Sequence, residues 1–157
     1  MAKALQFPPT KMVSIVHLFI LTKDGYILLF KGDNGFWGPI SGKIKRYETP
    51  IEAAIREAKE EIGFIIKHVY LTGFLFHCTS PKGKQICGIT CFTFLPDNID
   101  HKSFTFNHEI SKVVNVPKDK VLSVLRTLGF PEALSGLEYL MASHLIERFG
   151  TASEKSK

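Results

Sequence analysis

The sequence predicts a single mixed α/β domain, on the evidence of its length, its segment types and its lack of internal divisions. A chain of 157 residues favours one compact domain rather than two. Strand-like apolar runs occur together with helical patterns, and no repeat or linker separates them. We expect a lead-in over residues 1–11, where Pro8 and Pro9 lack backbone donors, a domain over 12–149, and a flexible polar tail over 150–157.

Apolar runs bounded by turn residues predict the strands. They cover residues 13–22, 26–30, 69–78, 86–95, 104–106 and 110–116, with a short extended piece at 36–39. Two helices are expected to close the chain, over residues 118–128 and 131–149. In the second, a stripe of apolar residues at helical spacing predicts a face turned to the core, and a partner-helix role is the other interpretation.

The best-specified element is a helix over residues 50–62. Thr49 is a suitable N-cap, Pro50 suits the first helical position, and Glu52 completes a capping box. Gly63 is a suitable stop. The helix has one apolar stripe at helical spacing, formed by Ile51, Ala54, Ile55, Ala58 and Ile62.

Charge and composition exclude few classes of function. The net charge of +5 is compatible with polyanionic partners such as nucleotides or RNA, but no basic stripe interleaved with aromatic residues supports RNA binding. The apolar run over residues 13–21 is interrupted by Ser14 and His17 and is shorter than the ~20 residues of a membrane span. Cys78, Cys87 and Cys91 match no zinc-ligand spacing, and reduced cysteines suit a cytoplasmic protein.

Three carboxylates share one face of the predicted helix. Glu57, Glu60 and Glu61 lie at positions i, i+3 and i+4, where like charges repel one another. Arg56 can pair with Glu60, which leaves an excess of about two negative charges. A hard divalent cation such as Mg²⁺ would neutralise this excess of negative charge, because it takes oxygen ligands. A solvated charged helix face is the alternative interpretation.

The residues around this helix resemble a Nudix box. A tight loop is expected at residues 39–42, where a carbonyl near Gly42 could supply a further metal ligand. Gly42 is followed by five residues, Glu48, seven residues and then the run Arg56-Glu57-Ala58-Lys59-Glu60-Glu61-Ile62-Gly63-Phe64. This arrangement matches the family pattern at every charged and every glycine position. Ala58 and Phe64 are mild departures at aliphatic positions, and Ser41 and Tyr47 stand where the family often has glycine.

The resemblance covers roughly residues 12–149 and implies a Nudix fold, in which a mixed β-sheet is sandwiched between α-helices and the box forms a catalytic loop-helix-loop. It implies hydrolysis of a nucleoside diphosphate linked to another moiety, nucleoside triphosphates included, with Mg²⁺ or Mn²⁺ as the cofactor. By the same resemblance, Glu60 and Glu61 are metal ligands, Glu57 is a ligand or the base that activates water, and Arg56 holds the carboxylates in place. Glu48 and the loop at Gly42 support or complete the site, and Glu48 is also expected among the substrate-binding residues.

A later glutamate often contributes to such sites. Glu109 is the best-placed candidate, with an ordinary loop glutamate as the alternative.

Substrate contacts are less specified. Phe36, Trp37 or Phe74 can stack a base, although a packed core ring fits Trp37 equally well. Lys43 and its basic neighbours can touch phosphates or form a solvated loop. Two other functions are left open: a non-catalytic Nudix domain that binds a nucleotide and regulates a partner, and an RNA 5′-pyrophosphohydrolase. The sequence selects neither the nucleotide nor the oligomeric state.

Overall fold

A seven-stranded mixed sheet forms the centre of the computed structural model, which describes residues 13–32, 34–80 and 82–155. The predicted lead-in over residues 1–11 lies outside this part of the chain. The elements in chain order are β1 (Val13–Leu21), β2 (Gly25–Lys31), β3 (Phe36–Gly38), β4 (Ile40–Lys43), α1 (Pro50–Ile62), β5 (Tyr70–Thr79), β6 (Gln85–Phe94), a 3₁₀ turn (His101–Ser103), β7 (Ile110–Pro117), α2 (Val121–Leu128), α3 (Pro131–Ala142) and α4 (Leu145–Lys155).

The sheet is mixed because β1 pairs in parallel with β6 and antiparallel with β2 and β4. The main strand order is β3-β2-β1-β6-β5, with β4 paired to β1 and β7 paired to β2. β1 is buried from Val16 to Leu21, as expected of a strand covered on both faces. This central position explains why its sequence is a nearly continuous apolar run.

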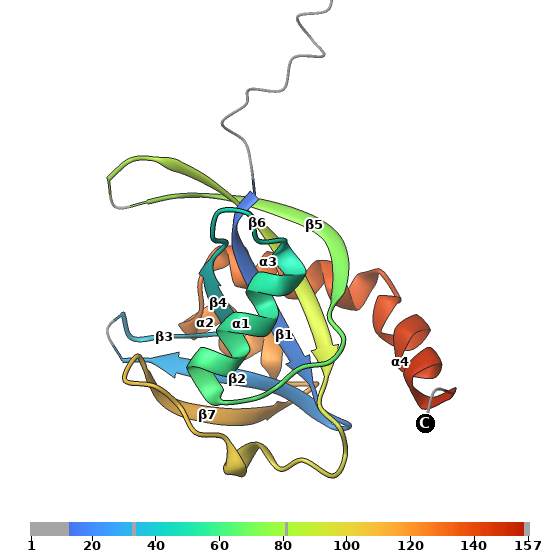
Figure 1. Cartoon of the computed structure of the whole chain (residues 1–157). Coiled ribbons are helices and arrows are strands. Elements are labelled where there is room, and N and C mark those ends of the chain that lie inside the picture. Colours follow the sequence, from blue (N-terminus) through green and yellow to red (C-terminus); the bar gives the residue numbers. More distant parts are fainter. Residues whose placement is uncertain (1–12, 33, 81, 156–157) are drawn as a thin grey trace, which may run out of the picture.

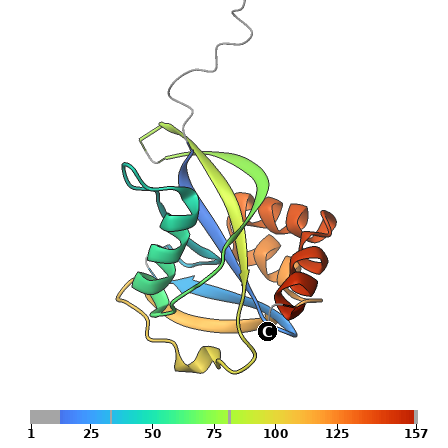
Figure 2. The same ribbon diagram turned by 45° about the vertical axis from the view of Figure 1, so that its right-hand side comes forward.

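Helices cover both faces of the sheet (Figures 1 and 2). On one face, α1 buries Ala54 and Ala58 in a core that includes Val16 of β1. On the other face, α3 buries Leu137 in a second core that includes Phe19 of β1. Successive side chains of a strand point to opposite faces, so β1 contributes to both cores. The predicted fold, a mixed sheet between helices, is confirmed.

The predicted ends of α1 are also confirmed. Glu52 donates its backbone N–H to the Thr49 hydroxyl at 3.1 Å, and Thr49 donates its own N–H to the Glu52 carboxylate at 3.1 Å. Pro50 begins the helix, and Gly63 ends it in the left-handed conformation with a φ of 67°. These local signals fix where the helix begins and ends.

Three local predictions were wrong. Residues 104–106 are not a strand; they follow the 3₁₀ turn, and Phe104 packs into the core beneath α1. The predicted helix over residues 131–149 is divided into α3 and α4 at Ser143 and His144, where His144 has a φ of 60°. Gly42 lies in β4, paired with Val16, rather than in a tight loop.

α4 continues to Lys155, past residue 150, where the flexible tail was expected to begin. Within the described ranges, no helix is long and apolar enough to cross a membrane.

Candidate active site

Arg56, in the middle of α1, is the centre of a network of ion pairs. It donates to both oxygens of Glu48, at 2.7 and 2.9 Å, and to Glu57 at 2.8 Å. The expected pair with Glu60 is present at 3.2 Å, and a fifth hydrogen bond reaches the backbone oxygen of Lys43 at 2.9 Å. The planar guanidinium can satisfy these acceptors together because its five donors have a fixed geometry.

This network fixes the charges of Glu48 and Arg56. The hydrogen bonds from Arg56 lower the pKa of Glu48 to about 2. The same hydrogen bonds raise the pKa of Arg56 above its usual range. Glu48 also accepts from the backbone N–H of Lys45 at 2.9 Å, so both of its oxygens are engaged within the protein. Glu48 therefore anchors Arg56 in this structure.

Gly42 allows β4 to lie directly against Glu57. A Cβ atom at this position would overlap the carboxylate carbon of Glu57. The backbone conformation does not require glycine here, because Gly42 is not among the residues with a positive φ. Glycine is required because the Glu57 side chain approaches the backbone closely. The Glu57 carboxylate is therefore contacted both by β4 and by Arg56.

We predict that Gly42→Ala lowers kcat about tenfold, because Glu57 must move away while the rest of the fold is retained. Steady-state kinetics and a thermal melt would test this. Gly150→Ala is the matched control, since its added Cβ would make an ordinary contact 3.6 Å from Phe94. Equal kcat values for Gly42→Ala and the wild type would show that the position of Glu57 does not matter.

Glu61 is buried, so this part of the charged helix face is not exposed to solvent. Only 2% of the residue is exposed, and one carboxylate oxygen lies 3.4 Å from the Lys31 ammonium. The other oxygen has no hydrogen-bond partner among the described residues. Burial raises the pKa of Glu61 to about 7, although Lys31 opposes the shift. Lys31 lies at the end of β2 and was not selected by the sequence analysis, because a single lysine after an apolar strand carries no specific signal.

Glu109 lies on a loop that is attached to the end of α1. The backbone N–H of Asn107 donates to the carbonyl of Glu61 at 3.1 Å, and the Asn107 side chain accepts from the N–H of Glu109 at 3.0 Å. The charge of Glu109 contributes to the raised pKa of Glu61. The exposed Glu109 carboxylate is therefore close enough to act electrostatically on the buried one.

The residues of this site fit a hard divalent cation. Glu61 presents a buried carboxylate oxygen without a partner, and an isolated buried anion is costly unless a cation compensates it. Glu57 and Glu60 extend from the same helix, Glu60 with half of its side chain exposed. In the described part of the chain, no three His, Cys, Asp or Glu side chains already converge on one point. Arg56 and Lys31 hold the carboxylates instead.

The predicted substrate-contacting residues lie at different places. Trp37 of β3 is half-buried and packs against Phe30, with ring centroids 5.2 Å apart, and against the second core. Phe74 packs against Tyr139 at 5.1 Å. Lys43 has an exposed side chain at the end of β4. Trp37 is therefore a ring packed against the core in this structure.

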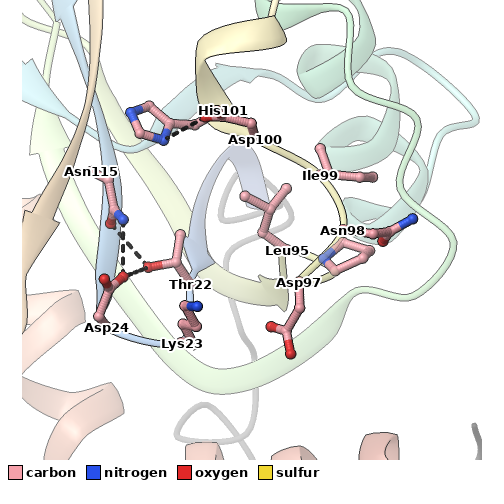
Figure 3. A pocket seen from close by; sticks show the side chains of 11 residues that line it. Thr22, Lys23, Asp24, Leu95, Asp97, Asn98, Ile99, Asp100, His101 and Asn115 are labelled. Carbon is pink, nitrogen blue, oxygen red and sulfur yellow. Dashed lines mark hydrogen bonds and ion pairs between the residues drawn. The ribbon is translucent and has the colours of Figure 1, made fainter.

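A separate hollow of about 300 Å³ lies at the turn between β1 and β2 (Figure 3). Its Asp24 accepts hydrogen bonds from Asn115 and Thr22, each at 3.0 Å, which lower the pKa of Asp24. Asp97 also lines it, whereas no residue of the box does.

Comparison with known proteins agrees with this fold. The family model described as NUDIX domain matches residues 10–133. The Nudix hydrolase YvcI of Bacillus subtilis is 24% identical over 115 residues, which cover 69% of this chain and 73% of that protein.

Solved structures resemble the fold at low sequence identity. The dihydroneopterin triphosphate pyrophosphohydrolase of E. coli has a TM-score of 0.67 at 16% identity, and the match covers 82% of this chain and 96% of that protein's chain. The MutT protein of Methanosarcina mazei Go1 has a TM-score of 0.67 at 18% identity, covering 87% and 98%. The NUDIX domain of Shewanella oneidensis NrtR, solved with ADP ribose, has a TM-score of 0.67 at 15% identity, covering 91% and 99%.

The mixed sheet between helices, with the box helix α1 on one face, is a Nudix fold. The chain belongs to the Nudix family, and it is an enzyme of the pyrophosphohydrolase type.

Proposed function

We propose that this enzyme hydrolyses the diphosphate linkage of a nucleoside diphosphate joined to another moiety, with Mg²⁺ or Mn²⁺ as cofactor. Nucleoside triphosphates belong to this substrate class. One observation carries the proposal: Glu61 is buried beside Lys31 with an unpartnered oxygen, at the end of a helix that also presents Glu57 and Glu60. A structural charged helix would place all of its carboxylates in solvent.

Each residue of the site has a role in this reaction. Glu57, Glu60, Glu61 and the backbone carbonyl of Gly42 would hold the ion. Bound Mg²⁺ supplies positive charge that neutralises the diphosphate in the transition state. Glu57 is either one of these ligands or the base that accepts the proton of the attacking water, and Glu109 is the alternative base.

Arg56 keeps Glu57 in position. The products are two phosphorylated fragments, for example a nucleoside monophosphate and pyrophosphate.

A panel of substrates tests the proposal. Nucleoside triphosphates, ADP-ribose, dinucleoside polyphosphates and a 5′-triphosphorylated RNA are incubated with the enzyme in Mg²⁺ or in excess EDTA, and the products are separated by chromatography. We expect at least one nucleotide to be hydrolysed in Mg²⁺ but not in EDTA. The rate of this hydrolysis should rise toward alkaline pH. Full activity in EDTA contradicts the mechanism. Binding without any hydrolysis would instead identify a non-catalytic regulator, and cleavage of RNA alone an RNA 5′-pyrophosphohydrolase.

A cytoplasmic location is part of the proposal. Cys78, Cys87 and Cys91 are free thiols, with Cys87 and Cys91 buried. Reduced cysteines are typical of a compartment kept reducing by glutathione and thioredoxin.

We predict that Glu109→Gln decreases kcat by a factor between a few-fold and about tenfold. The variant removes a carboxylate near Glu61 without removing a buried contact. The melting temperature should stay within a few degrees, since exposed loop substitutions usually cost under about 0.5 kcal/mol. Asp97→Asn is the control, because Asp97 lines the separate hollow at the β1–β2 turn. If both variants keep the wild-type kcat, Glu109 has no part in the reaction.

A further inference from the structure

Two segments rich in lysine and arginine lie at the end of the sheet where β1 begins. Residues 43–47 lead from the end of β4 toward α1, and residues 82–85 lead from the turn after β5 into β6. These nine residues contain five of the 20 lysines and arginines of the chain and no aspartate or glutamate, so this region is strongly positive. Its cations all have exposed side chains, and we call them the basic end: Lys43, Lys45, Arg46, Lys82 and Lys84.

The start of β1 brings the two segments together, although they are far apart in the sequence. The backbone N–H of Ile44 donates to the carbonyl of Ser14 at 2.9 Å, and the Ser14 hydroxyl donates to the carbonyl of Cys87 at 3.4 Å. β4 and β6 both pair with β1, so they lie roughly 10 Å apart at this end of the sheet. Figures 1 and 2 show the loop before α1 and the joined ends of β5 and β6 beside the start of β1. One extended ligand can therefore contact both segments.

Hydrogen bonds fix the backbone of both segments. The N–H of Lys45 donates to the Glu48 carboxylate at 2.9 Å, and the carbonyl of Lys45 accepts from the N–H of Glu48 at 3.0 Å. In the second segment, the N–H of Lys84 donates to the Ser80 hydroxyl at 3.1 Å, and its carbonyl accepts from the N–H of Ser80 at 2.8 Å. Among the described residues, no cation of the basic end forms an ion pair. Their charges are therefore available to an anionic ligand.

Tyr47 gives the basic end an aromatic surface. The residue is 91% exposed, and the Arg46 guanidinium lies 5.1 Å from the centre of its ring. Its φ of 68° is one that bulky residues rarely adopt, so neither packing nor the backbone calls for tyrosine at this position. An exposed ring among cations is the combination that binds unpaired bases, because the ring stacks on a base while the cations contact the phosphates.

We propose that the basic end binds single-stranded nucleic acid, with an unpaired base stacked on Tyr47 and phosphates beside Arg46, Lys82 and Lys84. Single strands fit better than a duplex, whose bases are already stacked on one another. They also fit better than an anionic membrane, which offers charge but no planar group for the ring. This inference goes beyond the proposed function, because a phosphodiester chain contains no diphosphate linkage.

Fluorescence anisotropy in EDTA tests this inference apart from catalysis. The probes are labelled oligouridylate and oligothymidylate of about 12 nucleotides, each with a 5′-hydroxyl, and a DNA duplex of the same length. We expect at least one single strand to bind more tightly than the duplex. Tyr47→Ala should weaken that single strand about fivefold or more, because the stacked base loses its platform. Tyr47→Phe, which keeps the ring, should bind like the wild type.

The salt dependence of binding tests the cations. Each phosphate contact with a single strand contributes roughly 0.7 to the slope of log K against log salt, so Lys82→Ala with Lys84→Ala should reduce this slope by about 1.4. Lys118→Ala with Lys120→Ala is the matched control, since these exposed lysines have the same spacing and lie by the β1–β2 turn, where Lys118 donates to the Asp24 carbonyl.

Three results overturn the inference. The first is that no single strand binds more tightly than the duplex, and the second is that Tyr47→Ala keeps the wild-type affinity. The third is that phosphatidylserine vesicles bind in a manner that requires Lys82 and Lys84 while no oligonucleotide binds, which would assign the basic end to a membrane surface. Loss of hydrolysis of every compound in the substrate panel would reject the proposed function alone, because the oligonucleotides are not cleaved in this test.

Discussion

Glu61→Gln is expected to lower kcat on the order of 10²-fold or more, because it removes a charge that holds the metal and stabilises the transition state. The glutamine has nearly the same shape and stays beside Lys31, so the fold should be kept. The measurement is kcat at saturating Mg²⁺, with Glu138→Gln as the matched control on the exposed face of α3. An unchanged kcat would mean that Glu61 is not a ligand.

The same variant should change how stability depends on pH in EDTA. The pKa of Glu61 is raised from 4.5 to about 7 in the folded protein, so the folded state binds this proton more tightly than the unfolded chain does. The wild type therefore loses stability relative to Glu61→Gln as the pH rises from about 5 to 8, by on the order of 3 kcal/mol. The lowered pKa of His17 acts in the opposite direction, but it is common to both proteins.

Urea unfolding at pH 5 and pH 8 in EDTA measures this difference between the two proteins. Glu138→Gln should follow the wild type at both pH values. A constant difference between the wild type and Glu61→Gln would show that the pKa of Glu61 is not raised by folding.

Arg56→Lys is expected to lower kcat about 10²-fold, although the positive charge is kept. A lysine ammonium cannot reproduce the planar fork that contacts Glu48, Glu57 and the carbonyl of Lys43 together. Loss of these charge-assisted hydrogen bonds should also reduce the free energy of unfolding by about 2 kcal/mol. Kinetics and urea unfolding test both effects.

Arg126→Lys, on the exposed side of α2, is the control for this substitution. Wild-type kcat in Arg56→Lys would show that charge alone is sufficient at this position.

The sequence by itself determined the fold class and the ends of the helix that carries the candidate site. Thr49, Pro50, Glu52 and Gly63 set the ends of α1, because capping and left-handed glycine act within a few residues along the chain. The spacing of Arg56 and Glu60 likewise produced the expected ion pair, since residues four apart meet on a helix.

Only the tertiary structure decided how the carboxylates differ from one another. Glu61 is buried because the end of β2 brings Lys31 against it and the loop at Asn107 packs over the end of α1. Gly42 meets Glu57 because β4 pairs with β1 beneath the helix. Such contacts join residues far apart in the chain, so no local pattern records them.

The same reason explains the errors in the fold. His17 looks like an interruption of an apolar strand, but the central position of β1 in the sheet buries it against the ring of Phe76 on β5. A continuous apolar stripe over residues 131–149 predicts one helix, but the second core is covered by two helices that turn at His144. Periodicity determines which side of an element is buried, whereas the packing partners determine where the element must end and which polar side chains lose contact with water.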